Sequence, residues 1–136
     1  MIFRKRTVVA FFIIAAVGVS VSATTANPEN DYTNLRILPK NISTKKLQHI
    51  MIDEFEDGLG VKCSFCHAEK KGSHSLDYSS DEKSEKGIAR KMMQMTIGLN
   101  KKYFSLKRPM IGDSVLVITC ITCHRGLPHP DLESIN

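Results

Sequence analysis

The chain contains the stretch Cys63-Ser64-Phe65-Cys66-His67, and the same pattern returns at Cys120-Ile121-Thr122-Cys123-His124. The two stretches hold all four cysteines of the 136-residue chain. Cys-x-x-Cys-His is the attachment signature of c-type haem, because two thiols three residues apart share one helical turn and the next residue can supply an imidazole to the iron. The sequence therefore predicts two covalently bound haem c groups, attached at Cys63, Cys66, Cys120 and Cys123, with His67 and His124 as axial ligands.

Other roles for paired cysteines explain the pattern less well. A disulfide framework, which export would permit, leaves the two histidines unexplained. A zinc site built from two such pairs has a spacing of roughly 15–20 residues, well short of the stretch between Cys66 and Cys120. A thioredoxin-like redox pair needs a βαβ context, which the sequence does not suggest.

The N-terminus has the three parts of a secretory signal peptide. Arg4, Lys5 and Arg6 precede an apolar run from Thr7 to about Val21, and small residues at Val21-Ser22-Ala23 offer a cleavage site. The run is shorter than the roughly 20 residues that span a bilayer, so a retained membrane anchor is the less favoured alternative. Cleavage after Ala23 would lower the net charge from +5 to +2, and scattered lysines without aromatic interleaving do not indicate nucleic-acid binding.

The rest of the chain favours helices that alternate with loops. Ser43 is a good N-cap for a helix that runs to about Asp57, with Leu47, Ile50, Met51 and Phe55 on one apolar stripe and Gly58 and Gly60 at its end. Residues 68–80 are polar and predict a loop. Ser79 and Glu82 predict a capping box for a second helix from about Asp81 to Phe104, on which Ile88, Met92, Met95, Leu99 and Tyr103 line one face. Val115-Leu116-Val117-Ile118 is a short β-prone run before the second motif.

The sixth ligand of each iron decides what such a protein can do. A second strong protein ligand closes the iron and favours electron transfer, whereas an open position allows catalysis. Met51 is a candidate for the first haem, although its place on the apolar stripe fits core packing equally well. Spacing alone leaves the second haem with Met92, Met95 or Met110, and methionines at helical spacing are most often core residues. Three free histidines are rival ligands that we expect to be solvated instead: His49, His74 and His129.

The sequence resembles the tetrahaem cytochrome subunit of photosynthetic reaction centres, and more closely one two-haem half of it. The similarity covers about residues 33–130 and is carried by Leu47 to Met51 with Gly60-Val61-Lys62 before the first motif, by Ala89-Arg90-Lys91-Met92-Met93-Gln94-Met95-Thr96 with Asn100, and by Thr119 through Gly126. The resemblance implies that Met51 ligates the first haem iron and Met92 the second. This chain has two motifs where the family subunit has four, and residues 100–120 match less closely, which leaves Met110 open.

These observations predict a mainly α, small multihaem cytochrome c fold, with two helix–loop–Cys-x-x-Cys-His units packed around two haems. We expect a signal peptide at 1–23, a polar extension at 24–32, a dihaem domain at 33–130 and a tail at 131–136. The predicted function is that of a periplasmic carrier of single electrons between redox protein partners, without enzyme activity. The alternatives are a small dihaem peroxidase or reductase and a haem-bearing docking subunit of a membrane respiratory or photosynthetic complex.

Overall fold

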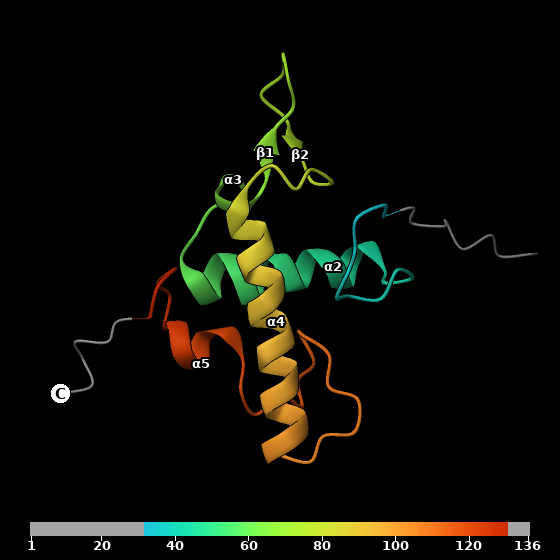
Figure 1. The fold of residues 1–136 in the computed structure, drawn as a ribbon, viewed down its shortest axis with the longest axis vertical. Helices are drawn as coiled ribbons and strands as arrows, with labels where there is room; N and C mark the ends of the chain where they lie inside the picture. The colour runs from blue at the N-terminus through green and yellow to red at the C-terminus, as the bar shows by residue number, and fades with distance from the viewer. Residues whose placement is uncertain (1–31, 131–136) are drawn as a thin grey trace, which may run out of the picture.

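The computed structural model describes residues 32–130, and the predicted signal peptide and C-terminal tail lie outside these residues. The described part is mostly helical, as predicted, with one small antiparallel sheet (Figure 1). In chain order its elements are α2 (Thr44–Ile50), η1 (Met51–Asp57), α3 (Cys63–Cys66), β1 (Ala68–Glu69), β2 (Leu76–Asp77), α4 (Ser84–Tyr103) and α5 (Cys120–His124).

The first predicted helix is present, and its N-terminal cap is the predicted one. The Ser43 hydroxyl accepts a hydrogen bond from the backbone N–H of Lys46, which satisfies one of the free donors at the start of α2. η1 ends at Asp57 with Gly58 as its C-cap, as the sequence predicted, and the backbone of Gly58 is still right-handed helical with φ −66°. The chain turns away at Gly60, whose φ of +64° belongs to the left-handed region that glycine adopts without strain.

The second half of this helix is a π-helix, η1, which the sequence did not indicate. It begins at Met51 and runs for seven residues. Runs of i→i+5 hydrogen bonds are rare and frequently lie at functional sites, and the wider turn changes the direction of the side chains that follow. Here the π-helix begins at Met51, the candidate ligand of the first haem. Met51 and Phe55 nevertheless pack against the hydrophobic core, as their place on the apolar stripe predicted.

The second predicted helix, α4, crosses the α2–η1 helix (Figure 1). It begins at Ser84 rather than Asp81, and the predicted capping box of Ser79 and Glu82 is wrong. The hydroxyl of Ser80 accepts the backbone N–H of Glu82, and the carboxylate of Asp77 accepts the backbone N–H groups of Ser79 and Ser80. These local side-chain bonds hold the segment in a turn, which delays the start of the helix.

The buried face of α4 is not the face that carries the predicted apolar stripe. Lys86, Met93, Thr96 and Asn100 are buried, whereas Ile88, Met92, Met95 and Tyr103 are exposed. The hydrophobic cluster lies where α4 crosses the first helix, and its buried members are Leu38, Ile42, Ile50, Met93 and Ile111. The protein's own core therefore uses one side of α4 and leaves an apolar row uncovered on another.

The predictions for two connecting segments need correction. The segment 68–80 is not wholly irregular, because Ala68 pairs with Asp77 and Glu69 with Leu76 in an antiparallel ladder. The β-prone run at 115–118 forms no strand. Its backbone N–H groups at Val117 and Ile118 donate instead to the side-chain oxygen of Asn100, and the Asn100 amide donates to the carbonyl oxygen of Ile118. The buried Asn100 side chain thus makes the backbone hydrogen bonds that a neighbouring strand would otherwise make.

Candidate haem-attachment centre

Both Cys-x-x-Cys-His motifs form short helices, α3 and α5 (Figure 1). All four thiols are free of disulfide bonds; Cys63 and Cys123 are exposed, while Cys66 and Cys120 are half-buried. Residues three apart on a helix point to the same side, so each helix presents its pair of thiols together. This is the arrangement that double thioether attachment needs.

The second motif is tied to the first helix. The backbone N–H of Cys120 donates to the Glu54 carboxylate at 3.2 Å, and the N–H of Gly126 donates to the carbonyl oxygen of Gly58 at 3.1 Å. Thr119 and Thr122 form a capping box at the start of α5. The motif therefore sits directly on η1, at a position fixed by backbone contacts as well as by side chains.

His124 is oriented for metal binding by one hydrogen bond. Its Nδ1 lies 3.0 Å from the carbonyl oxygen of Leu127. A carbonyl can only accept, so Nδ1 carries the proton in the neutral ring and Nε2 keeps a free lone pair. Metal-binding histidines are typically held in this way by a backbone carbonyl or a carboxylate.

The first motif is held against α4 by a different set of contacts. The Lys83 ammonium group donates to the carbonyl oxygen of Ser64 at 2.7 Å. The ring of His67 meets the ring of Tyr78 edge-on, with centroids 5.0 Å apart and planes at 67°. The Nδ1 atom of His67 is buried and has no hydrogen-bond partner. The two histidines thus have different supports: a carbonyl for His124 and an aromatic ring for His67.

Burial and nearby charge shift the pKa values of three motif residues. Burial, followed by the cations of Lys86 and Arg90, lowers the pKa of His67, so its imidazole is neutral at pH 7 and able to bind a metal. Burial and the Glu54 carboxyl raise the pKa of Cys120 to about 12. Burial raises the pKa of Cys66 as well. Both of these thiols are therefore protonated at neutral pH before attachment.

The methionines fall into two groups. Met93 is buried in the core, and the half-buried Met51 and Met110 pack against it. Met92 and Met95, by contrast, are 39% and 49% exposed on the uncovered row of α4. The structure therefore gives Met93 a packing role. Met51 and Met110 are both half-buried against the core, and Met92 and Met95 are exposed, so these four methionines remain ligand candidates.

The three rival histidines have exposed side chains in the structure. His49 is exposed and pairs with Asp53, with Nδ1 and the carboxylate oxygen 3.0 Å apart. His74 and His129 are exposed on loops. Within residues 32–130, no three His, Cys, Asp or Glu side chains gather into a group that could hold a bare metal ion.

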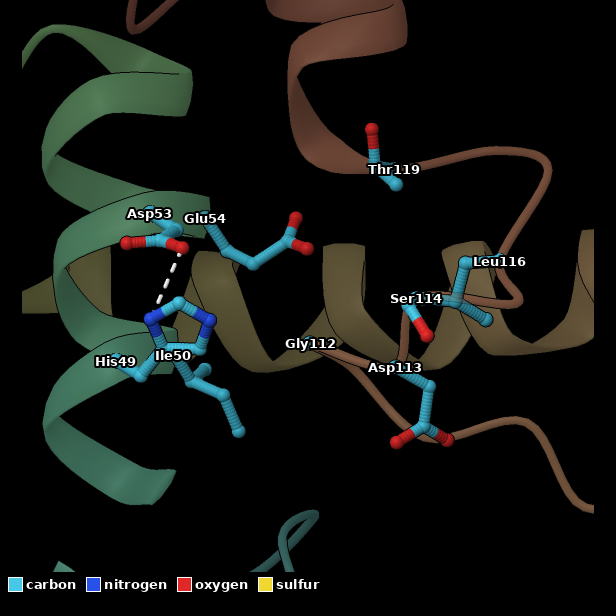
Figure 2. Close-up of a pocket in the computed structure, with 9 residues that line it drawn as sticks. All are labelled: His49, Ile50, Asp53, Glu54, Gly112, Asp113, Ser114, Leu116 and Thr119. Carbon is cyan, nitrogen blue, oxygen red and sulfur yellow. Dashed lines mark ion pairs between the residues drawn. The ribbon is translucent and has the colours of Figure 1, made fainter. Parts of the chain in front are cut away.

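A pocket of about 250 Å³ lies beside the second motif but contains none of the four cysteines (Figure 2). Its walls carry charged and polar side chains as well as apolar surface, with His49, Asp53 and Glu54 on one side and Asp113, Ser114 and Thr119 on the other. Figure 2 shows Glu54 reaching from the helix toward the segment that leads into α5. A porphyrin is largely apolar, so we do not assign this pocket to one; the side chains suited to that role are elsewhere.

Those side chains are apolar residues that remain exposed near the motifs. Besides the Met92 and Met95 row, they include Phe65 and Ile121 within the motifs and Val117 and Leu127 beside the second one. An exposed apolar row of this kind on a helix marks a surface suited to an apolar ligand or partner. Free paired thiols, a neutral His67, a correctly tautomerised His124 and this uncovered row together fit a covalently attached haem.

Comparison with known families decides the assignment. The family described as "Photosynthetic reaction centre cytochrome C subunit" matches residues 10–133. The chain belongs to this family. The resemblance found in the sequence is thereby confirmed, and membership of a cytochrome c family implies covalently bound haem c.

One curated relative is the photosynthetic reaction center cytochrome c subunit of Rubrivivax gelatinosus, which is 26% identical over 117 residues. The match covers 79% of this chain and 28% of the relative, so this cytochrome spans under a third of that protein's length. No solved structure matches the chain at a significant level. Within residues 32–130, none of the helices combines the length and the apolar character needed to cross a bilayer.

Sequence reasoning missed several residues that shape the centre. Glu54, Tyr78 and Lys86 contact the motifs or their supporting turn, yet each is an isolated polar residue with no motif around it. Lys86 lies on the same buried face of α4 as Met93 and Asn100. A lysine at such a position has no recognisable partner in the sequence, because its hydrogen-bond acceptors come from a segment that only the fold brings near.

Proposed function

We propose that this cytochrome is a dihaem electron carrier of the periplasm. Cys63 and Cys66 would hold one haem and Cys120 and Cys123 the other, with His67 and His124 as axial ligands. The observation that carries the proposal is that both motifs lie on short helices with free thiols, in a structure whose core leaves an apolar row on α4 uncovered. When bound, each haem iron supplies a one-electron ferric–ferrous couple.

We further propose Met51 and Met92 as the sixth ligands of the first and second haems. The packing of the motifs supports this pairing, because α3 lies directly on α4 and α5 lies directly on η1. Two axial ligands occupy opposite faces of a porphyrin, so they are expected on elements that are not packed together. Met51 on η1 then suits the first motif and Met92 on α4 suits the second. Met95, on the same exposed row, is the competing ligand for the second haem.

The residues of this chain would have four tasks in electron transfer. His67 and His124 would each donate a lone pair to an iron, and the methionine thioethers would close the remaining position against small molecules. Covalent attachment keeps the group in place during repeated oxidation and reduction. The short helices and the η1 contacts fix the two motifs relative to each other, so little rearrangement accompanies a change of charge.

The haem count tests the proposal directly. The purified protein should give two haems per chain in a pyridine haemochrome assay. The double variant Cys63→Ser/Cys66→Ser should keep one, and Cys120→Ser/Cys123→Ser should keep the other. Fewer than two haems in the unaltered protein would contradict the dihaem proposal.

The ligand assignment needs its own test. Met51→Ala and Met92→Ala should each remove half of the methionine-to-iron charge-transfer absorbance and lower one of two reduction potentials. Met95→Ala is the matched control on the same exposed row. If Met95→Ala removes the absorbance and Met92→Ala does not, the second ligand is Met95. If the protein consumes peroxide and one of its irons lacks a sixth ligand, it is instead the dihaem peroxidase named above as an alternative.

A second candidate role is that of a haem-bearing subunit docked on a membrane complex. Family membership supports it, since the relative from Rubrivivax gelatinosus bears the name of a reaction center subunit. Mass spectrometry of the protein from its native membrane would separate the two roles. Retention of residues 1–23, or co-purification with a membrane complex, would favour the docked subunit over the free periplasmic carrier.

A further inference from the structure

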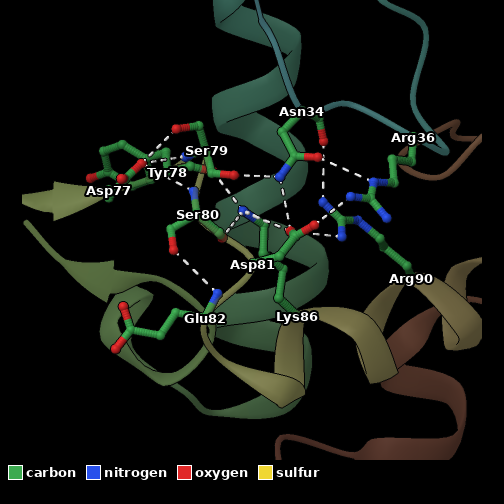
Figure 3. A network of polar contacts seen from close by, with 10 residues as sticks. All are labelled: Asn34, Arg36, Asp77, Tyr78, Ser79, Ser80, Asp81, Glu82, Lys86 and Arg90. Carbon is green, nitrogen blue, oxygen red and sulfur yellow. Dashed lines mark hydrogen bonds and ion pairs between the residues drawn. The ribbon is translucent and has the colours of Figure 1, made fainter.

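One polar network connects three segments next to the first motif (Figure 3). Asp81 lies at its centre and pairs with Arg36, Lys86 and Arg90, while the amide of Asn34 donates to the same carboxylate at 2.8 Å. Three cationic side chains thus meet one carboxylate. The network joins the segment before α2, the turn after β2 and the start of α4.

Lys86 is the buried member of this network. The residue is only 9% exposed, and its Nζ lies 3.8 Å from the Asp81 carboxylate, beyond hydrogen-bond distance. Its ammonium group donates instead to two carbonyl oxygens, those of Tyr78 and Ser80, each at 2.7 Å. A buried cation is costly unless hydrogen-bonded, so these two bonds hold the turn at 78–80 firmly to α4.

The turn that Lys86 holds carries the ring that supports His67. Tyr78 packs edge-on against the His67 ring at 5.0 Å, and no acceptor is available for the buried Nδ1 of His67. His124, in the other motif, has the Leu127 carbonyl for this purpose. The first motif therefore lacks the usual hydrogen bond that fixes a metal-binding imidazole, and the Tyr78 ring occupies the neighbouring position.

We propose that Lys86 is a positioning residue for His67, acting through the Tyr78 turn. Its two hydrogen bonds fix the backbone of Tyr78, and the Tyr78 ring fixes the plane of the imidazole in place of a hydrogen bond to Nδ1. The proposal rests on the proposed function, because it concerns how one axial ligand is held. The same buried charge near the ligand opposes loss of an electron from the iron, so it raises the reduction potential of that haem relative to an uncharged residue.

The test compares variants of the holoprotein by electron paramagnetic resonance and by redox titration. Lys86→Met keeps the apolar stem and removes the ammonium group. It should change the low-spin ferric signal of one haem and lower one of the two potentials. Lys91→Met, an exposed lysine on the same helix, is the matched control and should leave both signals and both potentials unchanged.

A second pair of variants covers the case in which Lys86→Met fails to fold. Tyr78→Ala removes the ring and should alter the same ferric signal, while Tyr78→Phe keeps the ring and should not. Unchanged signals and potentials in Tyr78→Ala with both haems attached would overturn the inference, as would equal changes in Tyr78→Phe. A wild-type protein with Cys63 and Cys66 unmodified by peptide mass spectrometry would contradict the proposed function instead.

Discussion

Replacing Gly60 with alanine tests whether the two motifs are held together by backbone contact. Gly60 lies three residues before Cys63, and a Cβ atom on it would overlap the carbonyl oxygen of Gly126, two residues after His124. Backbone cannot rotate away as a flexible side chain can. The substitution must therefore push apart the segments that carry the two motifs.

Gly72 provides the matched control. Its φ is +73°, close to the +64° of Gly60, but a Cβ there would meet no atom within 4 Å. A left-handed backbone costs an L-residue about 1–2 kcal/mol, and both alanines incur this cost. Overpacking against fixed atoms adds about 1–3 kcal/mol, and only Gly60→Ala incurs that. The difference between the two variants should therefore be about 1–3 kcal/mol.

Thermal unfolding of the holoproteins, followed by far-UV circular dichroism, measures this difference. A change of 1 kcal/mol moves the Tm of a domain of this size by about 4–8 °C, so Gly60→Ala should melt at least about 4 °C below Gly72→Ala. The haem content of each variant is measured in parallel, so that proteins with the same number of attached haems are compared. Equal melting temperatures with equal haem content would refute the close contact between Gly60 and Gly126.

Three further predictions concern α4 and its network. Met93→Ala should destabilise the protein by about 2–5 kcal/mol in urea unfolding, because a buried side chain is removed, yet retain the charge-transfer absorbance that Met92→Ala diminishes. Asn100→Ala should cost about 2–4 kcal/mol in the same assay, because it leaves buried backbone groups at 117–118 without partners; a loss below 1 kcal/mol would contradict this. Hydrogen bonds from Asn34 and then Arg90 lower the pKa of Asp81 from 3.8 in the folded protein, so its contribution to stability is present above that pH and is lost as the pH falls through the folded pKa. Asp81→Asn should therefore flatten the fall in Tm below about pH 4, and an unchanged slope would argue against the network.

The sequence alone was enough for the features that depend on local spacing. The Cys-x-x-Cys-His pattern is a covalent requirement, and it placed two motifs that the structure shows as short helices. Helical periodicity located the first helix and its Ser43 cap, and a 20-residue second helix to within three residues at its start. Family resemblance pointed to the cytochrome family, which the family match confirms.

Prediction from sequence failed where side chains from distant segments compete. The Ser79 and Glu82 capping box was reasonable locally, but Ser80 and Asp77 hydrogen-bond the turn instead, and Asp81 is drawn to the Arg36 and Arg90 side chains. The β-prone run before the second motif found its hydrogen bonds in Asn100, seventeen and eighteen positions away. Neither outcome follows from propensity, because both depend on which groups the tertiary fold brings near.

The sequence by itself determined that two haem-attachment motifs and two methionine-bearing helices are present, because these depend on residues a few positions apart. Only the tertiary structure decided which face of α4 is packed and which is left to an apolar group, since the crossing with α2–η1 selects Met93 rather than Met92 and Met95 for the core. It also placed the Leu127 carbonyl beside His124, the Tyr78 ring beside His67, and the Lys86 ammonium group against the Tyr78 carbonyl. The physical reason is that burial and hydrogen-bond partners are properties of the assembled fold and are set by contacts between distant residues.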